Sequence, residues 1–192
     1  MGSLGEQTFV RQATALHAEP DAASEQVSEA LPGEPVTVAE QRNGWARVET
    51  AYDYTGWVEA ASLGGERRVD WLEPTAADPV EHARTLLGAP YRWGGMTGRG
   101  IDCSGLVHVS FRATGRLIPR DAHLQEAAGE LVDDPQAGDL VSYGDAGGAD
   151  HVAFWLGDGR ILHATGRHGV CAVVEEVEPP ELRARRRQFF RF

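Results

Sequence analysis

In residues 100–115, GIDCSGLVHVSFRATG, a glycine-containing segment leads directly into an amphipathic run. Leu106 and Phe111 fall with their apolar neighbours on one helical stripe, and the final glycine is a typical C-terminal stop. The pattern predicts a helix from Cys103 to Thr114, with the cysteine in its first turn.

Cys103 has the surroundings of a reactive thiol. The first turn of a helix carries the positive end of the helix dipole, which lowers the pKa of a thiol and favours the attacking thiolate. Ser104 and Gly105 are small, so a carbonyl could approach the sulfur and its oxyanion could meet backbone N–H groups. The other cysteine, Cys171, lies in a valine-rich run and is expected to be a buried apolar residue. We interpret Cys103 as the nucleophile.

A thiol nucleophile needs a base, and His151 is the best placed of the seven histidines. It begins an apolar strand, and His163 lies in the next strand beyond a Gly-Asp-Gly turn. A three-residue loop with Gly159 as a bulge would place Ala153 opposite His163, and His151 diagonally on the same face. A two-residue loop would turn His163 to the other face. The functional interpretation requires the bulged register, with His163 orienting His151.

The first third of the chain predicts a small all-β barrel, assigned to residues 1–65. Short β-type runs are separated by the turn signals Pro32-Gly33, Asn43-Gly44 and Thr55-Gly56, and they cover 8–13, 35–38, 45–48 and 56–58. A charged joint at residues 64–68 marks the boundary, and residues 66–192 form the second domain.

The second domain predicts helices first and strands afterwards. Asp78-Pro79 opens a helix that stops at Gly88, and Asp121 is the expected N-cap of a short helix through Ala128. Strands are predicted at 139–143, 151–156, 160–165, 170–177 and 188–192. The arginine-rich segment 183–191 is expected to be a solvated helix or turn before the last strand. This order indicates an α+β fold rather than a doubly wound parallel sheet.

Composition and charge exclude several functions. The 192 residues carry 18 Lys+Arg against 29 Asp+Glu, and the net charge of −11 argues against a nucleic-acid partner. Every basic residue is arginine, which excludes Schiff-base and P-loop lysine chemistry. Two cysteines are too few for a disulfide framework or a thiolate zinc site, and no metal or cofactor is expected. Without signal-peptide features in Met1–Val10 or a run long enough to span a membrane, we expect a cytoplasmic protein of open oligomeric state.

Six sequence blocks, taken together, resemble the NlpC/P60 cysteine peptidases of bacterial cell walls. The blocks are YRWGG (91–95), DCSGLV (102–107), PRD (119–121), GDLV (138–141), HVA (151–153) and HA (163–164). The order of Gly33, Gly44-Trp45 and Tyr54-Thr55-Gly56-Trp57-Val58 resembles a bacterial SH3 domain. The combination is similar to γ-D-glutamyl-diamino-acid endopeptidases acting on murein stem peptides, and it implies a papain-like α+β catalytic fold.

The resemblance also implies roles for individual residues. It makes Cys103 the nucleophile, His151 the base, His163 the residue that orients the base, and the Tyr91 hydroxyl a helper at the oxyanion. The position of Asp121 implies a carboxylate for the free amine of the substrate's L-Ala, which restricts the enzyme to released stems.

The remaining implied residues bind substrate. Asp102, Ser104 and Trp93 are expected to line the groove, and Tyr54 and Glu19 of the SH3-like part are the candidates to meet the same amine. The chain departs from the pattern at Ala122, where such enzymes often have serine, so one hydrogen bond to substrate is in doubt.

Two other functions remain open from the sequence. One is a binding module in which the SH3-like part recognises wall peptide beside an inert second domain. The other is a related papain-like amidase or acyltransferase. The third stem residue, which could be diaminopimelate, lysine or ornithine, is not fixed by the sequence.

Overall fold

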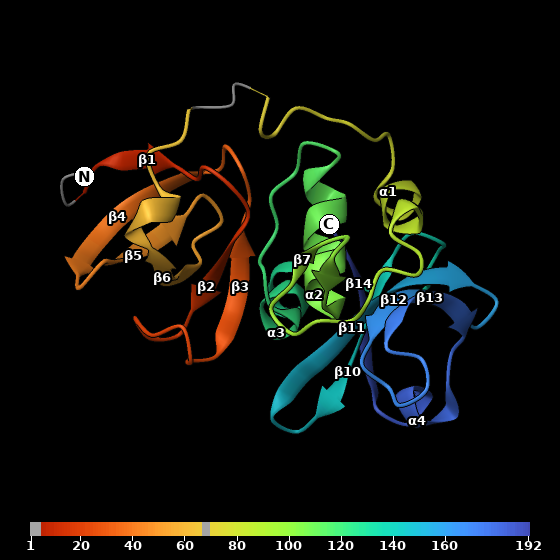
Figure 1. Ribbon diagram of the computed structural model, residues 1–192. Coiled ribbons are helices and arrows are strands. Elements are labelled where there is room, and N and C mark those ends of the chain that lie inside the picture. Colours follow the sequence, from red (N-terminus) through yellow and green to blue (C-terminus); the bar gives the residue numbers. More distant parts are fainter. Residues whose placement is uncertain (1–4, 67–69) are drawn as a thin grey trace.

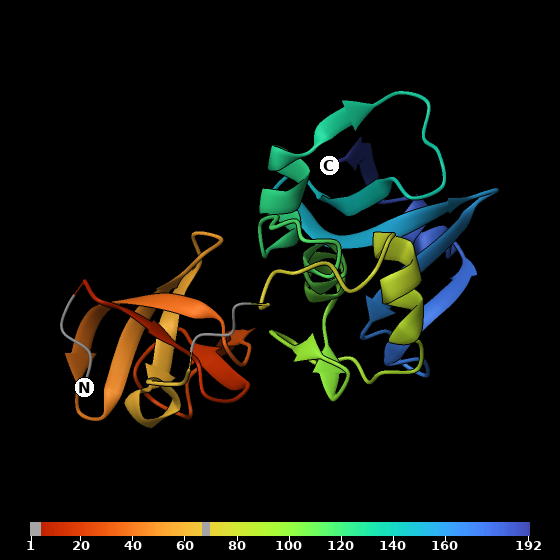
Figure 2. The same cartoon turned by 90° about the horizontal axis from the view of Figure 1, so that it is seen from above.

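The computed structural model describes residues 5–66 and 70–192, which form two bodies (Figure 1). The N-terminal strands make one body, and the second surrounds the central helix α2 (Figure 2). The predicted division between residues 65 and 66 stays a prediction, and Arg67 and Arg68 of the predicted joint lie outside the described residues.

The first body is an antiparallel sheet in the order β1-β4-β5-β6-β2-β3. Its elements are β1 (Gln7–Phe9), β2 (Thr14–His17), β3 (Gln26–Ala30), β4 (Pro35–Arg42), β5 (Trp45–Thr50), β6 (Thr55–Glu59) and the 3₁₀ turn η1 (Ala60–Ser62). Alternate residues of β4 and β5, among them Val36, Val38 and Val48, point into one apolar core. The expected all-β body is therefore present.

Two details of the first body differ from the sequence prediction. The run 8–13 is not one strand, because the chain bends after Val10, which forms an isolated bridge to Leu63. Strand β3 was not predicted. Its sequence QVSEA is partly polar because Ser28 and Glu29 make hydrogen bonds to the second body.

The second body combines helices with an antiparallel sheet in the order β13-β12-β11-β10-β14-β9. Its helices are α1 (Pro79–Thr85), α2 (Cys103–Arg112), α3 (Ala122–Ala128) and α4 (Pro180–Arg183). Its strands are β7 (Met96–Thr97), β8 (Gly100–Ile101), β9 (Glu130–Val132), β10 (Leu140–Asp145), β11 (Gly148–Gly157), β12 (Arg160–Thr165), β13 (Ala172–Val177) and β14 (Arg186–Arg191). The predicted α+β class is confirmed, although the short strands β7 and β8 precede α2 and helix α4 lies between β13 and β14.

Helix α2 lies at the centre of this body (Figure 1). Every residue from Cys103 to Phe111 is buried, and the helix packs against β11 and β12 through the apolar cluster that includes Val152, Phe154 and Leu162. The opposite face of the sheet is covered by a second cluster that holds Tyr143. A helix covered on all sides holds its N-terminal residue in a fixed position.

Local capping explains where the helices begin. The Asp78 carboxylate accepts hydrogen bonds from the backbone N–H groups of Val80 and Glu81, with proline at the first helical position. Asp102 caps α2 by accepting from Gly105 N at 2.7 Å. Asp121 occupies the N-cap position of α3 as predicted, but its side chain makes no capping hydrogen bond. The Asp121 carboxylate is therefore free of the helix end and available to bind other groups.

Two predictions about the C-terminal part were wrong. Strand β13 begins at Ala172, and Cys171 is exposed in the preceding loop with a φ of 49° rather than buried in the strand. The arginine-rich segment is not a solvated turn, since β14 begins at Arg186 and its arginines pair with carboxylates. Arg186 pairs with the buried Glu178, and Arg191 with Asp139.

Candidate functional site

A cavity of about 410 Å³ lies where the two bodies meet, with Cys103 in its wall. The first body contributes Glu25, Val27 and Tyr54. The second contributes Trp93, Asp102, Cys103, Ser104, Asp121, Ala122, His123, Ala149 and Asp150. The fold therefore brings most of the sequence-predicted site residues to one cavity.

Cys103 is the first residue of α2, and its side chain is buried. Burial, and secondarily the charge of Asp102, raises the pKa of the Cys103 thiol to about 12. Backbone hydrogen bonds from Val152 and Ser104 and the Arg120 charge act in the opposite direction but are outweighed. The expected lowering of this pKa by the helix dipole is therefore wrong for the free protein, because desolvation of a thiolate outweighs one helix end.

His151 and His163 form the pair that the bulged register requires. Nε2 of His151 lies 2.7 Å from Nδ1 of His163. Phe154 pairs with Leu162, a register that continues to Ala153 opposite His163. The predicted face is confirmed, but the predicted loop is wrong: Asp158 and Gly159 form a two-residue turn, and the extra residue lies between Trp155 and Gly157.

The histidine pair is connected to the thiol through the next residue of β11. Val152, whose backbone interacts with the Cys103 sulfur, follows His151 directly. With Nε2 of His151 on His163, Nδ1 is the ring nitrogen left to receive a thiol proton. Burial, followed by electrostatic interaction with His163 and Arg185, lowers the pKa of His151 to about 3, so the imidazole is neutral at neutral pH.

Sequence reasoning missed Glu176, which makes a hydrogen bond to His163 on the side away from His151. Nε2 of His163 is 3.0 Å from Oε1 of Glu176 on β13. The alternation of side chains along a strand could have predicted the position of Glu176. Val174 pairs with His163, so a residue two positions along points to the same face as His163.

Tyr91 is close enough to Cys103 for the two groups to affect each other electrostatically. Burial raises the pKa of the Tyr91 hydroxyl, and the nearby Cys103 and Asp102 raise it further. Its backbone is held by the hydrogen bond from Tyr91 N to Cys171 O. The hydroxyl therefore stays protonated at neutral pH and can donate a hydrogen bond.

Tyr54 and Asp121 meet across the two bodies. The Tyr54 hydroxyl donates to Val27 O at 3.3 Å and lies close enough to the Asp121 carboxyl to lower its pKa. Burial raises the pKa of Asp121, although the nearby Arg120 opposes this. A half-buried carboxylate in the cavity wall is suited to hold a cation.

The structure does not bring Glu19 to this site. Glu19 lies in an exposed turn where its backbone N–H bonds to Ser24 Oγ. The acidic residue of the first body that lines the cavity is Glu25, whose carboxylate accepts from Nε1 of Trp93 at 2.8 Å. Trp93 itself is 59% exposed at the cavity wall.

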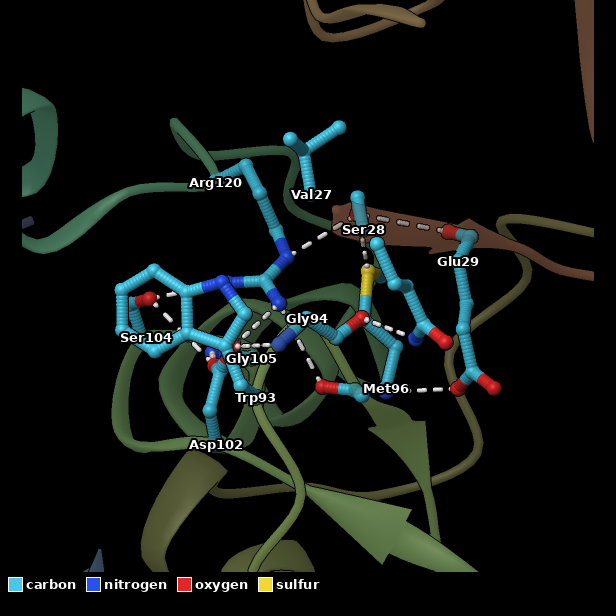
Figure 3. A network of polar contacts seen from close by, with 12 residues as sticks. Val27, Ser28, Glu29, Trp93, Gly94, Met96, Asp102, Ser104, Gly105 and Arg120 are labelled. Carbon is cyan, nitrogen blue, oxygen red and sulfur yellow. Dashed lines mark hydrogen bonds and ion pairs between the residues drawn. The ribbon is translucent and has the colours of Figure 1, made fainter. Parts of the chain in front are cut away.

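Asp102 and Ser104 line the cavity as expected, but their polar atoms face the buried Arg120 (Figure 3). Arg120 is 1% exposed and donates to Asp102 Oδ2 at 2.7 Å and to Ser104 Oγ at 2.8 Å. Its Nε donates to Ser28 Oγ of β3 at 3.1 Å. One guanidinium therefore ties the first body to the start of the nucleophile helix.

Further hydrogen bonds join β3 to Gly94 and to Met96 at the start of β7 (Figure 3). Gln26 donates to Gly94 O at 3.1 Å, and Met96 N donates to Glu29 Oε2 at 2.7 Å. Gly94 N in turn donates to Asp102 Oδ2 at 2.8 Å. The cavity walls supplied by the two bodies are thus held in register.

Within residues 5–66 and 70–192, no three His, Cys, Asp or Glu side chains gather in a way that could hold a metal ion. The same part of the chain contains no helix with the length and apolar character needed to cross a membrane.

Comparison with known proteins agrees with this geometry. The NlpC/P60 family matches residues 88–184, and a bacterial dipeptidyl-peptidase SH3 domain matches residues 16–63. The γ-D-glutamyl-L-lysine dipeptidyl-peptidase of Bacillus subtilis (strain 168) is 38% identical over 70% of this chain and 51% of its own. The peptidoglycan endopeptidase RipB of Mycobacterium tuberculosis is 38% identical over 49% of this chain and 45% of its own. The chain thus spans about half the length of these two relatives.

Solved structures show the same arrangement over nearly the whole chain. The crystal structure of an NlpC/P60 family protein from Bacillus cereus covers 98% of this chain and 64% of its own, with 25% identity and a TM-score of 0.58. The family match covers half of the chain and includes Cys103, His151 and His163. The protein therefore belongs to the NlpC/P60 family, with its catalytic-type α+β domain preceded by a bacterial SH3 domain.

Proposed function

We propose that this protein is a cysteine peptidase that hydrolyses the bond between γ-D-Glu and the diamino acid in murein stem peptides carrying a free N-terminal L-Ala. The observation that carries the proposal is that Cys103 starts a buried helix and interacts with the backbone of Val152, the residue after His151, whose ring is hydrogen-bonded to His163. The relatives named as dipeptidyl-peptidase and peptidoglycan endopeptidase support this class of substrate.

The reaction follows from the positions of these groups. Nδ1 of His151 takes the thiol proton as the Cys103 sulfur attacks the γ-carbonyl carbon, and the carbonyl π electrons move to the oxygen. Backbone N–H groups at the start of α2 and the Tyr91 hydroxyl are the donors for that oxyanion. When the tetrahedral intermediate collapses, the amine leaves with the proton from His151. Water then hydrolyses the thioester, with His151 again as base.

The free amine of the substrate is proposed to bind between the two domains. The Asp121 carboxylate and the Tyr54 hydroxyl line the same cavity there, and Glu25 takes the place that the sequence assigned to Glu19. An ammonium ion in this position would be held by two carboxylates in a partly buried cavity. Such a site discriminates against a blocked amine, which offers neither charge nor the same hydrogen bonds.

The test is hydrolysis of L-Ala-γ-D-Glu-diamino-acid tripeptide and its N-acetyl analogue, with products identified by mass. We expect cleavage only at the γ-D-Glu bond and only of the free amine, and no cleavage by Cys103→Ala. Binding of the tripeptide without cleavage would instead indicate a binding module. Cleavage between glycan and peptide would indicate an amidase.

The proposed binding site for the substrate amine is tested separately with Asp121→Ala. Removing the carboxylate partner of a partly buried ammonium typically costs about 2–5 kcal/mol, so Asp121→Ala should lower kcat/KM for the free-amine tripeptide roughly 30-fold or more. Asp145→Ala is the matched control, because Asp145 is an exposed carboxylate on β10 outside the cavity lining. If Asp121→Ala keeps full preference for the free amine, the amine binds elsewhere.

A further inference from the structure

Glu176 continues the series of hydrogen bonds that begins at His151. The strand register places Val174 opposite His163, and Glu176 lies two residues further on the same face. This repeats the diagonal relation between His151 and His163 on the two preceding strands. Three successive strands therefore each contribute one side chain to a single chain of contacts. The measured distances are 2.7 Å from His151 Nε2 to His163 Nδ1 and 3.0 Å from His163 Nε2 to Glu176 Oε1.

Arg167 holds Glu176 in its ionised form. Its Nη2 lies 2.9 Å from Oε1 and 2.7 Å from Oε2 of the carboxylate. Burial alone would raise the pKa of Glu176, but hydrogen bonds from Arg167 and His163 outweigh burial and lower it. At neutral pH the group is a carboxylate, which can accept hydrogen bonds and cannot donate one.

His163 carries a single ring proton. It is fully buried, and this burial lowers its pKa in spite of the opposing hydrogen bond with Glu176. A neutral imidazole has one N–H donor and one lone-pair acceptor, so the group that bonds to one nitrogen decides what the other can do.

The positions of the protons follow from these two facts. Nε2 of His163 faces a carboxylate and must donate, so Nδ1 of His163 is the acceptor. Nε2 of His151 must then donate to that nitrogen. Nδ1 of His151 is left with its lone pair, which is the form a general base needs. The opposite order would place a proton on Nδ1 of His151 and remove the base.

We propose that Glu176 is a positioning residue that fixes the tautomers of both histidines and so makes His151 a base at its Nδ1. This inference rests on the proposed cysteine-peptidase function, in which His151 takes the thiol proton. Glu176 acts through His163 and does not touch the substrate. Once His151 is protonated, the Glu176 carboxylate also stabilises the positive charge through His163.

The variant that tests this is Glu176→Met, which keeps the side-chain length and removes the acceptor. The wrong tautomer in a catalytic triad lowers turnover by up to about 10⁴-fold. Because the His163–His151 contact remains, we expect a fall in kcat of at least about tenfold with little change in KM. Glu176→Gln retains an acceptor oxygen and should recover most of the lost kcat.

Glu175→Met is the matched control. Glu175 is the neighbouring carboxylate on the same strand, and it pairs with Arg84 and Arg160 instead of a histidine. Glu175→Met removes the same charge from β13 as Glu176→Met, so a general effect of charge or strand stability would appear in both variants. We expect kcat of Glu175→Met to stay within about twofold of the unchanged protein.

The direct measurement is the ¹⁵N NMR spectrum of the histidine rings at neutral pH, which shows which nitrogen carries the proton. The unchanged protein should show a proton on Nε2 of both His151 and His163, and Glu176→Met should show a mixture. A proton on Nδ1 of His163 in the unchanged protein would overturn the proposal even if no variant folds. So would a Glu176→Met variant with unchanged kcat. The spectrum needs no substrate, so it decides this proposal even if the murein tripeptide is not cleaved.

Discussion

Replacing Arg120 with methionine should destabilise the protein and disturb the start of the nucleophile helix together. Arg120 is buried and donates to Asp102, Ser104 and Ser28, which belong to the helix start and to the first domain (Figure 3). Methionine fills a similar volume but cannot donate a hydrogen bond. The change therefore removes the polar connection while keeping most of the packing.

The loss of stability in Arg120→Met can be estimated from the carboxylate that loses its partner. Asp102 is 5% exposed, and without Arg120 its carboxylate would be a buried charge without its cation. Breaking a buried ion pair from one side costs about 3–5 kcal/mol. For a chain of this size each kcal/mol lowers Tm by about 2–4 °C, which gives a fall of roughly 6–20 °C. The Cys103 thiol should also become harder to ionise, because the Arg120 charge lowers its pKa.

The assay is urea unfolding and thermal melting of Arg120→Met beside Arg116→Met. Arg116 is an exposed arginine whose side chain stacks on Phe111, so its loss should change stability by less than about 0.5 kcal/mol. Adding Asp102→Asn to Arg120→Met should restore part of the stability, because asparagine can still cap the helix and carries no charge. A loss below about 1 kcal/mol, or no recovery in the double variant, would refute the role assigned to the ion pair.

Two further predictions concern titration. Burial raises the pKa of Glu34 from 4.5 to about 7, so the folded state keeps a proton that the unfolded state loses, and stability should fall between pH 4.5 and 7 by up to about 3 kcal/mol. In Glu34→Gln the unfolding free energy at pH 5 and pH 7.5 should therefore differ much less than in the unchanged protein. In a Cys171→Ser background, which removes the exposed thiol, the iodoacetamide rate at Cys103 should keep rising with pH beyond pH 9. A plateau below pH 9 would contradict the raised pKa of Cys103.

The positions of the proposed nucleophile and the two histidines were predictable from the sequence because these residues lie on regular elements. Cys103 follows from the helix pattern and its N-cap, and the face shared by His151 and His163 follows from strand alternation. The loop between the histidine strands was predicted wrongly, although the register was right. A bulge can lie anywhere along a hairpin, and sequence places it poorly when several glycines surround the turn.

The contribution of the first domain was harder to predict. Glu19 and Glu25 flank one loop, and only the path of the chain between β2 and β3 decides which of them reaches the cavity. Strand β3 was missed because its polar residues bond to the other domain, whereas strand patterns assume a core face and a solvent face. The desolvation of Cys103 also depends on tertiary packing, which a prediction of the thiol pKa from the helix dipole alone does not include.

In the proposed mechanism, the resting thiol of Cys103 differs in charge from the attacking thiolate. In the free protein burial keeps the Cys103 thiol and the His151 imidazole neutral, so proton transfer between them must create two charges in a dry site. Each charge has a partner already in place. Arg120 lies near the thiolate, and Glu176 reaches the imidazolium through His163. Both partners are themselves paired, Arg120 with Asp102 and Glu176 with Arg167, which weakens their pull on the resting site. The raised pKa of Cys103 and the lowered pKa of His151 therefore disfavour the charged pair in the free protein, and the resting thiol is less open to oxidation, which follows thiolate character.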